Sequence, residues 1–278
     1  MLSVETLKPL IEREFEAVFS GNKFDDISKD SIDAIKATID LLDTGELRVC
    51  EKINGTWEVH QWAKKAILLY FRIKKMKVQD MGLLKFVDKI PLKQWNGTEG
   101  VRVVPHAVVR KGAYVCPGAI LMPSYVNIGA YVGSGTMVDT WATVGSCAQI
   151  GANVHLSGGV GIGGVLEPLQ ASPVIIEDNV FVGSRSIIVE GAIIEEGAVI
   201  GAGVTITGST RIIDVTGDSE VIHRGRVPKN SIVIPGSSPK TFKSGTYMIP
   251  SALIIGTRST NTDLKTSLNA ALRDSESF

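Results

Sequence analysis

One aliphatic residue returns every six positions along the chain from about Val101 to Ser237. Five such hexads follow one another in unbroken phase in the clearest run. Their aliphatic residues are Val126, Val132, Val138, Val144 and Ile150. A small residue usually stands four positions after each of them. A period of six fits neither a helix face nor a simple alternating strand, so the pattern predicts a solenoid.

Each hexad is expected to form one short strand and one corner, so that three hexads close one triangular coil. The aliphatic residue points inward at the corner, and glycine at the second position of a hexad relieves backbone strain there. Stacked coils pair each backbone N–H and C=O with the neighbouring coil and bury a shared aliphatic column. A β-sandwich is the alternative, but its turns are spaced more loosely, at about 8–12 residues.

The phase of the repeat changes in two places. The six-residue step already holds from Val103, and a slip of one residue around Pro123 resets the frame. Over residues 167–173 the phase is lost, and it resumes at Ile176. A third short run begins at Val227. The residues that leave the phase are expected to form an insertion on one side of the coils.

The N-terminal residues do not share the six-residue rule. Apolar residues recur at helical spacing in 7–19 and 32–42, which predicts two amphipathic helices. A hairpin is expected to turn at Asn54-Gly55, and 61–75 is expected to form a third helix with an apolar stripe and a basic face. The Gly, Pro and charged residues of 77–100 are typical of a linker.

Together these patterns predict a mainly β protein with three parts. Residues 1–100 form an α-rich cap and linker, residues 101–237 a parallel β-helix, and residues 238–278 a C-terminal extension. Within the extension, 247–256 is expected to form a strand and 263–272 a short helix. Such terminal pieces cover the open end of a solenoid, whose last coil otherwise offers unpaired edges.

Charge and cysteine content narrow the range of partners. The 278 residues carry 29 Lys and Arg against 29 Asp and Glu, so no net positive charge favours binding to nucleic acid or to an anionic membrane. Three cysteines without a Cys-x-x-Cys pair predict no disulfide framework. Neither a signal peptide nor a membrane span is indicated. We therefore expect a cytoplasmic protein that acts on small molecules.

Three short motif matches are discarded because their context is wrong. Residues 159–164 satisfy G-x-G-x-x-G, but they lie within the hexad phase and no helix follows. Residues 237–240 satisfy S-x-x-K without the companion motifs of that hydrolase class. The four histidines are scattered, so the three-histidine zinc site of some hexapeptide-coil enzymes is not expected, and no other metal site is predicted.

Residues separated by three hexads should stack on adjacent coils, which places Asp139 beside Ser157. The coil 156–165 is rich in glycine, so a ligand could approach its backbone N–H groups closely, and tight packing at a coil corner is the alternative. Further coils bring Arg185 and Glu190, and Arg102 precedes the first coil. Two arginines and two acids around a bare coil suit a ligand that bears carboxylates, because guanidinium binds them with two hydrogen bonds. A solvated turn is the alternative interpretation of Asp139.

Several of these runs resemble one known family. They are Gly135-Thr-Met-Val-Asp139-Thr-Trp141, the glycine-rich coil Leu156-Ser-Gly-Gly-Val-Gly-Ile-Gly-Gly-Val165, Leu41-Leu-Asp43 and Gly225-Arg-Val-Pro228. Over nearly the whole chain the sequence is similar to the tetrahydrodipicolinate N-succinyltransferases, which are hexapeptide-repeat acyltransferases of diaminopimelate and lysine biosynthesis. The resemblance implies transfer of a succinyl group from succinyl-CoA to the amino group of ring-opened tetrahydrodipicolinate.

The resemblance also implies a left-handed β-helix and a homotrimer with its active sites between adjacent subunits. Succinyl-CoA is a co-substrate, and no permanently bound cofactor is implied. The family's substrate-binding arginine and aspartate correspond to Arg102 and Asp139, and the nearest match to an assisting glutamate is Glu190. Ser157, which stacks on Asp139, and Arg185 are added as substrate-binding residues.

The required chemistry assigns roles to these residues. The amine loses a proton as it attacks the thioester, so a general base is needed, with Asp139 as first choice and His155 as second. Backbone N–H groups of the coil between Gly158 and Gly164 could stabilise the oxyanion and hold the CoA thioester. Lys240 could meet a CoA phosphate. Residues 237–260 are expected to act as a lid over CoA because of their Gly, Ser and Pro content.

Two other functions stay open at this point. A hexapeptide acyltransferase for another amine would use a histidine base, so His155 rather than Asp139 would be essential. A scaffolding or ice-binding solenoid would need a regular polar array on one face. The outward residues Trp141, Cys147 and Asn153 occupy equivalent positions and are irregular, which disfavours this third function.

Overall fold

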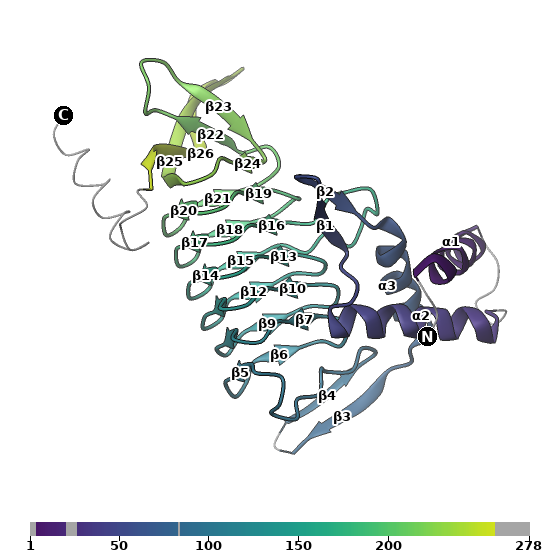
Figure 1. Cartoon of the computed structure of the whole chain (residues 1–278). Coiled ribbons are helices and arrows are strands. Elements are labelled where there is room, and N and C mark those ends of the chain that lie inside the picture. Colours follow the sequence, from purple (N-terminus) through teal and green to yellow (C-terminus); the bar gives the residue numbers. More distant parts are fainter. Residues whose placement is uncertain (1–3, 21–26, 83, 259–278) are drawn as a thin grey trace.

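The structure is a computed structural model that describes residues 4–20, 27–82 and 84–258. The predicted helix 263–272 lies outside the described residues. Two-residue strands stack into three parallel sheets around one triangular prism (Figure 1). The predicted fold class, a mainly β protein built on a parallel β-helix with an N-terminal helical part, is confirmed.

The three sheets are named I, II and III in the order in which the chain first reaches them. The stacked strands of sheet I are β5 Arg102–Val103, β8 Ile120–Leu121, β11 Met137–Val138, β14 His155–Leu156, β17 Phe181–Val182 and β20 Val199–Ile200. Those of sheet II are β6 Val108–Val109, β9 Tyr125–Val126, β12 Thr143–Val144, β15 Gly161–Ile162, β18 Ile187–Ile188 and β21 Thr205–Ile206. Those of sheet III are β7 Tyr114–Val115, β10 Tyr131–Val132, β13 Gln149–Ile150, β16 Ile175–Ile176, β19 Ile193–Ile194 and β24 Arg226–Val227.

The second residue of each strand points into the prism and the first points outward, as period-two alternation requires. Val138, for example, is fully buried, and so is Ala142 four positions later. The inner residues of all three sheets join one continuous aliphatic core. The aliphatic residue therefore lies on the strand, and the turn that makes the corner follows it by two positions.

The pairing register reports each irregularity of the repeat. Met137 pairs with His155, which lies three full hexads further along the chain. Ile120 instead pairs with Met137, one position short of three hexads, so the predicted slip around Pro123 is confirmed. Across the insertion, Gln149 pairs with Ile175, whereas three regular hexads would have ended at Glu167. The coil that contains the insertion is therefore longer than its neighbours by eight positions.

Positive φ angles occur mainly at the fourth position of a hexad, not at the second. Trp141, Cys147 and Asn153 occupy this position with φ of 62°, 67° and 53°. The second-position glycines have another reason. A Cβ on Gly183 would lie 2.5 Å from the backbone nitrogen of Ala202 on the next coil. The expectation that these glycines relieve strain was wrong, because they permit close backbone approach between coils.

Three helices and a hairpin form the N-terminal part, as predicted. The helices are α1 Val4–Phe19, α2 Lys29–Thr44 and α3 Gln61–Ile73, and the hairpin joins β1 Cys50–Ile53 to β2 Thr56–Val59. Asn54 and Gly55 at its turn both have positive φ, as a two-residue hairpin loop requires. A second apolar cluster holds the helices against Ile128 and Cys147 of the β-helix.

The predicted linker is partly a second hairpin. Strands β3 Lys77–Met81 and β4 Leu84–Asp88 pair in antiparallel register near the N-terminal end of the prism (Figure 1). Of the Gly and Pro residues that suggested irregular chain, Gly82 lies in the connection between the two strands, whereas Pro91, Gly97 and Gly100 follow β4. Beyond the hairpin, Leu92 pairs with Arg110 of the first coil. The segment therefore lies against the open N-terminal end of the solenoid.

A long hairpin covers the other end. Strand β25 Ser231–Phe242 continues sheet I from β20 and then pairs in antiparallel register with β26 Gly245–Thr257. Beside them lie β22 Arg211–Asp214 and β23 Val221–Arg224 (Figure 1). The strand predicted over 247–256 is confirmed. The expected lid lies largely within β25 and β26, which end at residue 257. Its role as a lid stays a prediction.

The first hairpin is attached to sheet III through one carboxylate. Glu177 is 9% exposed and accepts hydrogen bonds from Lys52 Nζ at 2.7 Å and Trp57 Nε1 at 2.8 Å. The backbone N–H of Glu196 donates to its other oxygen at 3.1 Å. Burial alone raises the pKa of Glu177, but these hydrogen bonds and the Lys52 charge outweigh burial, so the net pKa is lowered.

Alanine at Gly183 should destabilise the β-helix, because its Cβ would meet backbone atoms of the adjacent coil. We expect a loss of about 1–3 kcal/mol in the free energy of unfolding, as for other overpacked sites. Gly161→Ala is the matched control, because the nearest atom to its Cβ is Ile187 Cγ1 at 3.8 Å. Urea denaturation measures both variants, and equal stability of the two would contradict the stacking argument.

The lowered pKa of Glu177 predicts a specific acid sensitivity. A carboxyl whose pKa is depressed on folding stabilises the protein fully above the unfolded pKa of about 4.3. That stability is lost as the pH falls through the lower, folded pKa. The urea midpoint of Glu177→Gln should therefore fall less steeply than that of the wild type as the pH is lowered. Glu58 is exposed on the same hairpin, and Glu58→Gln should keep the pH dependence of the wild type.

Candidate active site

Four predicted site residues lie on one edge of the prism, between sheets I and II. Asp139, Ser157 and Gly158 follow β11 and β14, and Arg185 follows β17. The predicted stacking of Asp139 beside Ser157 is confirmed, because their preceding strands pair residue for residue. The Asp139 N–H donates to Leu156 O at 2.9 Å, and the Arg185 N–H donates to Gly158 O at 3.1 Å. These side chains therefore emerge from three successive coils.

The carboxylate of Asp139 is half-buried and only partly engaged. Its Oδ1 accepts the backbone N–H of Thr140 at 2.6 Å and the Thr140 hydroxyl at 3.1 Å. Among the described residues, Oδ2 has no partner. The hydrogen bonds from Thr140 fix the orientation of the carboxylate and leave one oxygen for a ligand. An ionised carboxylate in this arrangement can accept a proton or hold an ammonium group.

Arg185 lies across the glycine-rich coil. A Cβ on Gly159 would lie 2.8 Å from Arg185 Cδ and 2.9 Å from its Nε, so the missing side chain makes room for the arginine. Arg185 makes no ion pair within the described part of the chain, and its side chain is exposed. Its guanidinium is thus available for a carboxylate at the edge that carries Asp139.

Arg102 and His155 point outward from sheet I. Arg102 lies on β5, two strands below β11 in the same sheet, and has no ion-pair partner among the described residues. His155 lies on β14 and stacks on Phe181 with ring centroids 5.3 Å apart. Strands in a sheet are about 4.8 Å apart, so Arg102 is about 10 Å from the Asp139 coil, on the adjoining face.

Glu190 and Gly164 lie on a different edge, between sheets II and III. Glu190 follows β18, has a φ of 57° and is exposed, and Gly164 packs against Gly145 and Ser146 of the coil below. Within one chain, this edge and the Asp139 edge are separated by sheet II. The structure therefore does not bring Glu190 beside Asp139 inside a single subunit.

The eight-residue insertion leaves the coil at the Gly164 edge and is held by a buried lysine. Lys64 of α3 is 0% exposed, although the helix was expected to present a basic face. That expectation was wrong for this residue. Its ammonium donates to the carbonyls of Pro168, Leu169 and Ala171 at 3.2, 3.0 and 2.9 Å. Three carbonyl acceptors match the three donors of an ammonium group.

The predicted CoA contact Lys240, and a further cation, Arg72, lie apart from these edges. Lys240 is exposed on β25 in the outer hairpin, with its Nζ 5.2 Å from the ring centroid of Phe242. Arg72 borders a hollow of about 330 Å³ between α1, α3 and the insertion. Its guanidinium lies 5.6 Å from the Phe19 ring. Neither residue shares the edge that carries Asp139.

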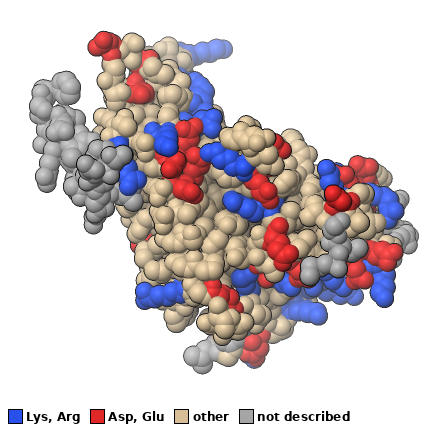
Figure 2. Space-filling model, in the orientation of Figure 1, with Lys and Arg blue, Asp and Glu red and all other residues tan. Residues whose placement is uncertain are grey.

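Sheet II leaves large apolar residues uncovered beside the Asp139 edge. Trp141 is 69% exposed and Ile187 is 45% exposed. A shallow hollow of about 190 Å³ lies next to Trp141 and is also bordered by His106 and Tyr125. In the view of Figure 2, uncharged side chains cover most of the β-helix, whereas charged ones gather over the N-terminal helices and near the C-terminal coils.

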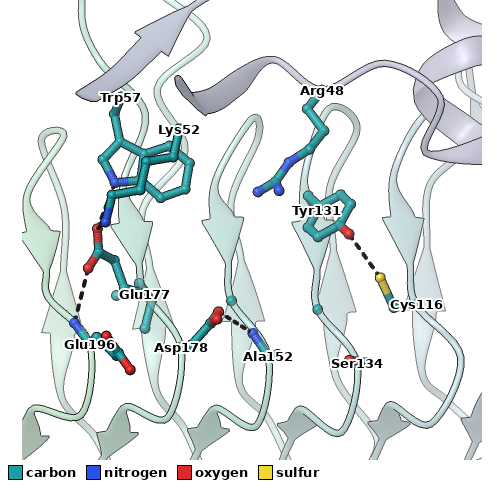
Figure 3. Close-up of a pocket in the computed structure, with 13 residues that line it drawn as sticks. Arg48, Lys52, Trp57, Cys116, Tyr131, Ser134, Ala152, Glu177, Asp178 and Glu196 are labelled. Carbon is teal, nitrogen blue, oxygen red and sulfur yellow. Dashed lines mark hydrogen bonds and ion pairs between the residues drawn. The ribbon is translucent and has the colours of Figure 1, made fainter. Parts of the chain in front are cut away.

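A second polar hollow, which the sequence analysis did not identify, lies on sheet III beneath the first hairpin (Figure 3). Its charged lining comes from Arg48 and Lys52 before and within the hairpin and from Glu177, Asp178 and Glu196 of the β-helix. These two groups of residues are far apart in sequence. The outward Tyr131 of β10 lines the hollow, but the six-residue period does not distinguish it from the outward residues of the other strands.

Comparison with known proteins agrees with these features. The profile for the N-terminal part of tetrahydrodipicolinate N-succinyltransferase matches residues 6–73, and the profile for the hexapeptide repeat of succinyl-transferases matches residues 173–208. The 2,3,4,5-tetrahydropyridine-2,6-dicarboxylate N-succinyltransferase of Psychrobacter cryohalolentis is 57% identical, covering 96% of this chain and 99% of its own. That of Legionella pneumophila is 50% identical, covering 97% and 98%.

A solved structure supports the fold. A Campylobacter jejuni protein described as a 2,3,4,5-tetrahydropyridine-2-carboxylate N-succinyltransferase superposes with a TM-score of 0.52 at 16% identity, over 85% of this chain and 64% of that one. The stacked hexapeptide coils with a polar edge and a bare glycine coil define an acyltransferase of the hexapeptide-repeat class. Within that class, the chain belongs to the 2,3,4,5-tetrahydropyridine-2,6-dicarboxylate N-succinyltransferase family.

Proposed function

We propose that the protein transfers the succinyl group of succinyl-CoA to the amino group of ring-opened tetrahydrodipicolinate, in diaminopimelate and lysine biosynthesis. The observation that carries this proposal is the edge between sheets I and II. There Asp139, with one free carboxylate oxygen, and the unpaired guanidinium of Arg185 flank the glycine-rich coil. High identity to the succinyltransferase family over 96% of the chain supports the choice of substrates.

In the proposed mechanism, Arg185 and Arg102 hold the carboxylates of the acceptor, and Ser157 lines the same edge. The free oxygen of Asp139 takes the proton that the amine loses as its nitrogen attacks the thioester carbonyl. The N–H groups of Gly159, Gly161 and Gly163 already donate to protein carbonyls, so the expected use of this whole coil as an oxyanion site is reduced to one donor. The backbone N–H of Gly158, which donates to no carbonyl in the described part of the chain, stabilises the oxyanion. The carbon–sulfur bond then breaks, the amide forms, and the proton leaves with CoA as its thiol.

We further propose a homotrimer with its active sites between subunits. Glu190 lies on the edge between sheets II and III, so it can serve the Asp139 site only from a neighbouring chain. The exposed Trp141 and Ile187 on sheet II supply apolar surface for such a contact. A parallel arrangement of three prisms would bring one edge of each chain toward another edge of the next, as closed cyclic symmetry requires.

The proposed setting is the cytoplasm. Cys50, Cys116 and Cys147 are all free thiols, as in proteins of reducing compartments. Burial raises the pKa of Cys50 to about 11 and that of Cys147 to about 12, which keeps both in the unreactive thiol form. None of the helices in the described residues is long and apolar enough to cross a membrane.

Removing the Asp139 charge should abolish most of the activity. Thiol release is measured on mixing the enzyme with succinyl-CoA and L-2-aminopimelate, an acceptor analogue. We expect Asp139→Asn, which keeps the acceptor oxygen for Thr140, to lower kcat by about 100-fold or more, the usual share of a general base. A fully active Asp139→Asn with an inactive His155→Ala would instead favour an acyltransferase with a histidine base.

Mixed trimers test whether the site is shared between chains. Trimers made only of Asp139→Asn chains or only of Glu190→Gln chains should each have low activity. If one chain supplies Asp139 and its neighbour Glu190, an equal mixture reassembled from unfolded chains should regain about a quarter of the wild-type rate by random association. Mixing without unfolding is the control. No gain on reassembly, with trimers present, would contradict a site that combines these two residues.

A further inference from the structure

The hollow on sheet III has the features of a ligand site separate from the succinyl-transfer edge. Its volume is about 320 Å³, at the small end of the range for ligand pockets. The first hairpin forms one wall, with Trp57, and the floor is formed by Tyr131 of sheet III and by residues that follow the strands of that sheet, among them Gly133, Gly151 and Asp178 (Figure 3). None of the residues assigned to succinyl transfer lines it.

One cation in this hollow lacks an anionic partner. Arg48 uses its Nε to donate to Gln149 Oε1 at 3.0 Å. Its two terminal nitrogens have no hydrogen-bond partner and no carboxylate within ion-pair distance among the described residues. Burial lowers the pKa of Arg48, and the nearby Tyr131 and Glu51, neither of which forms an ion pair with it, offset burial only in part. A guanidinium with two free NH₂ groups is suited to a ligand carboxylate.

The guanidinium of Arg48 is held in place from two sides. It lies over the ring of Tyr131, with Cζ 3.7 Å from the ring centroid. Gln149 is 1% exposed, and its amide donates to Cys147 O at 2.9 Å, which turns its carbonyl oxygen toward Arg48. The donors of Arg48 are therefore oriented before any ligand arrives, which reduces the entropy cost of binding.

The opposite side of the hollow carries one unpaired negative charge. Lys52 is paired with Glu177 at 2.7 Å, and Glu196 is paired with Lys229 at 2.8 Å. Asp178 makes no ion pair among the described residues. Its Oδ1 accepts the N–H of Ala152 at 2.8 Å and its Oδ2 has no partner there.

Figure 3 shows Asp178 bordering, from below, the hollow that Arg48 enters from above. Within the described residues, one unpaired positive and one unpaired negative charge therefore face the same space. A phosphate or a dicarboxylate would bring excess negative charge toward the acidic side, whereas a zwitterion is complementary to both sides. The apolar faces of Trp57 and Tyr131 provide contact for carbon atoms between the two charged ends.

We propose that this hollow binds a free amino acid as its zwitterion, with the carboxylate on Arg48 and an ammonium group on Asp178. The site does not depend on the succinyl-transfer reaction. Its ligand would contact both the N-terminal hairpin and the β-helix, and would therefore stabilise their association by mass action.

The position of Cys116 allows binding to be tested at the site itself. Cys116 lines the hollow, is partly exposed and lies 3.1 Å from the Tyr131 hydroxyl, whereas Cys50 and Cys147 are buried. Iodoacetamide should therefore alkylate Cys116 first. L-lysine is the probe, because it carries an ammonium group next to its carboxylate and a second one at the end of its chain. Saturating L-lysine should slow the alkylation of Cys116, measured by peptide mass spectrometry on the whole protein.

Two variants separate the charged contacts from the fold. Arg48→Met keeps an apolar stem against Tyr131, and Asp178→Asn keeps the acceptor for Ala152. Each should weaken L-lysine binding by about 10- to 100-fold in calorimetry, the usual loss for one hydrogen-bonded charge. Arg13→Met on the exposed side of α1 is the control and should bind as the wild type does. Unchanged urea midpoints verify that the variants fold. If Arg48→Met does not fold, Asp178→Asn alone tests the charged contacts.

Hexanoate and n-butylamine distinguish a zwitterion site from simpler ones. Each carries only one of the two charges and should bind at least about tenfold more weakly than L-lysine. Hexanoate binding as tightly as L-lysine, with no effect of Asp178→Asn, would replace the proposal by a simple carboxylate site. Absence of both a calorimetric signal and Cys116 protection with L-lysine would overturn it.

Discussion

Close backbone stacking between successive coils is the constraint on which the rest of this structure depends. Each coil hydrogen-bonds to the next along all three sheets, and glycine at Gly145, Gly151 and Gly183 lets the backbones approach closely at the corners. At the edge between sheets I and II, Gly183 packs against the backbone of the next coil, and the N–H groups of Gly159 and Arg185 donate to carbonyls of the neighbouring coils. The same stacking therefore places Asp139, Ser157 and Arg185 on successive coils of one edge.

Much of this architecture could be predicted because the repeat is local. The six-residue step determined which residues face inward, and counting three hexads along the chain was enough to place Asp139 on Ser157. Glycine function was harder to predict. A sequence shows that a position is bare, but whether the cause is a left-handed φ, as at Gly159, or a neighbouring backbone, as at Gly183, depends on the geometry of two coils together.

Contacts between the N-terminal part and the β-helix could not be predicted in the same way. Arg48 meets Gln149, and Lys52 meets Glu177, across long stretches of sequence without any period to relate them. Sheet III, which these contacts cover, therefore differs from sheets I and II in its role. Sheet II leaves apolar residues such as Ile187 exposed, whereas the covered sheet III borders a polar hollow within a single chain.

Lys64 has a consequence for how the molecule assembles. Its ammonium is fully buried and donates to three carbonyls of the insertion, one of which, Pro168 O, also accepts the N–H of Ala171. The helix is not complete without the insertion, because a buried charge without acceptors is costly. The helical part and the coils around residue 168 therefore belong to one cooperative unit of folding. A shortened chain that lacks α3 would lose the ordered insertion as well, so the β-helix is not a freely separable module.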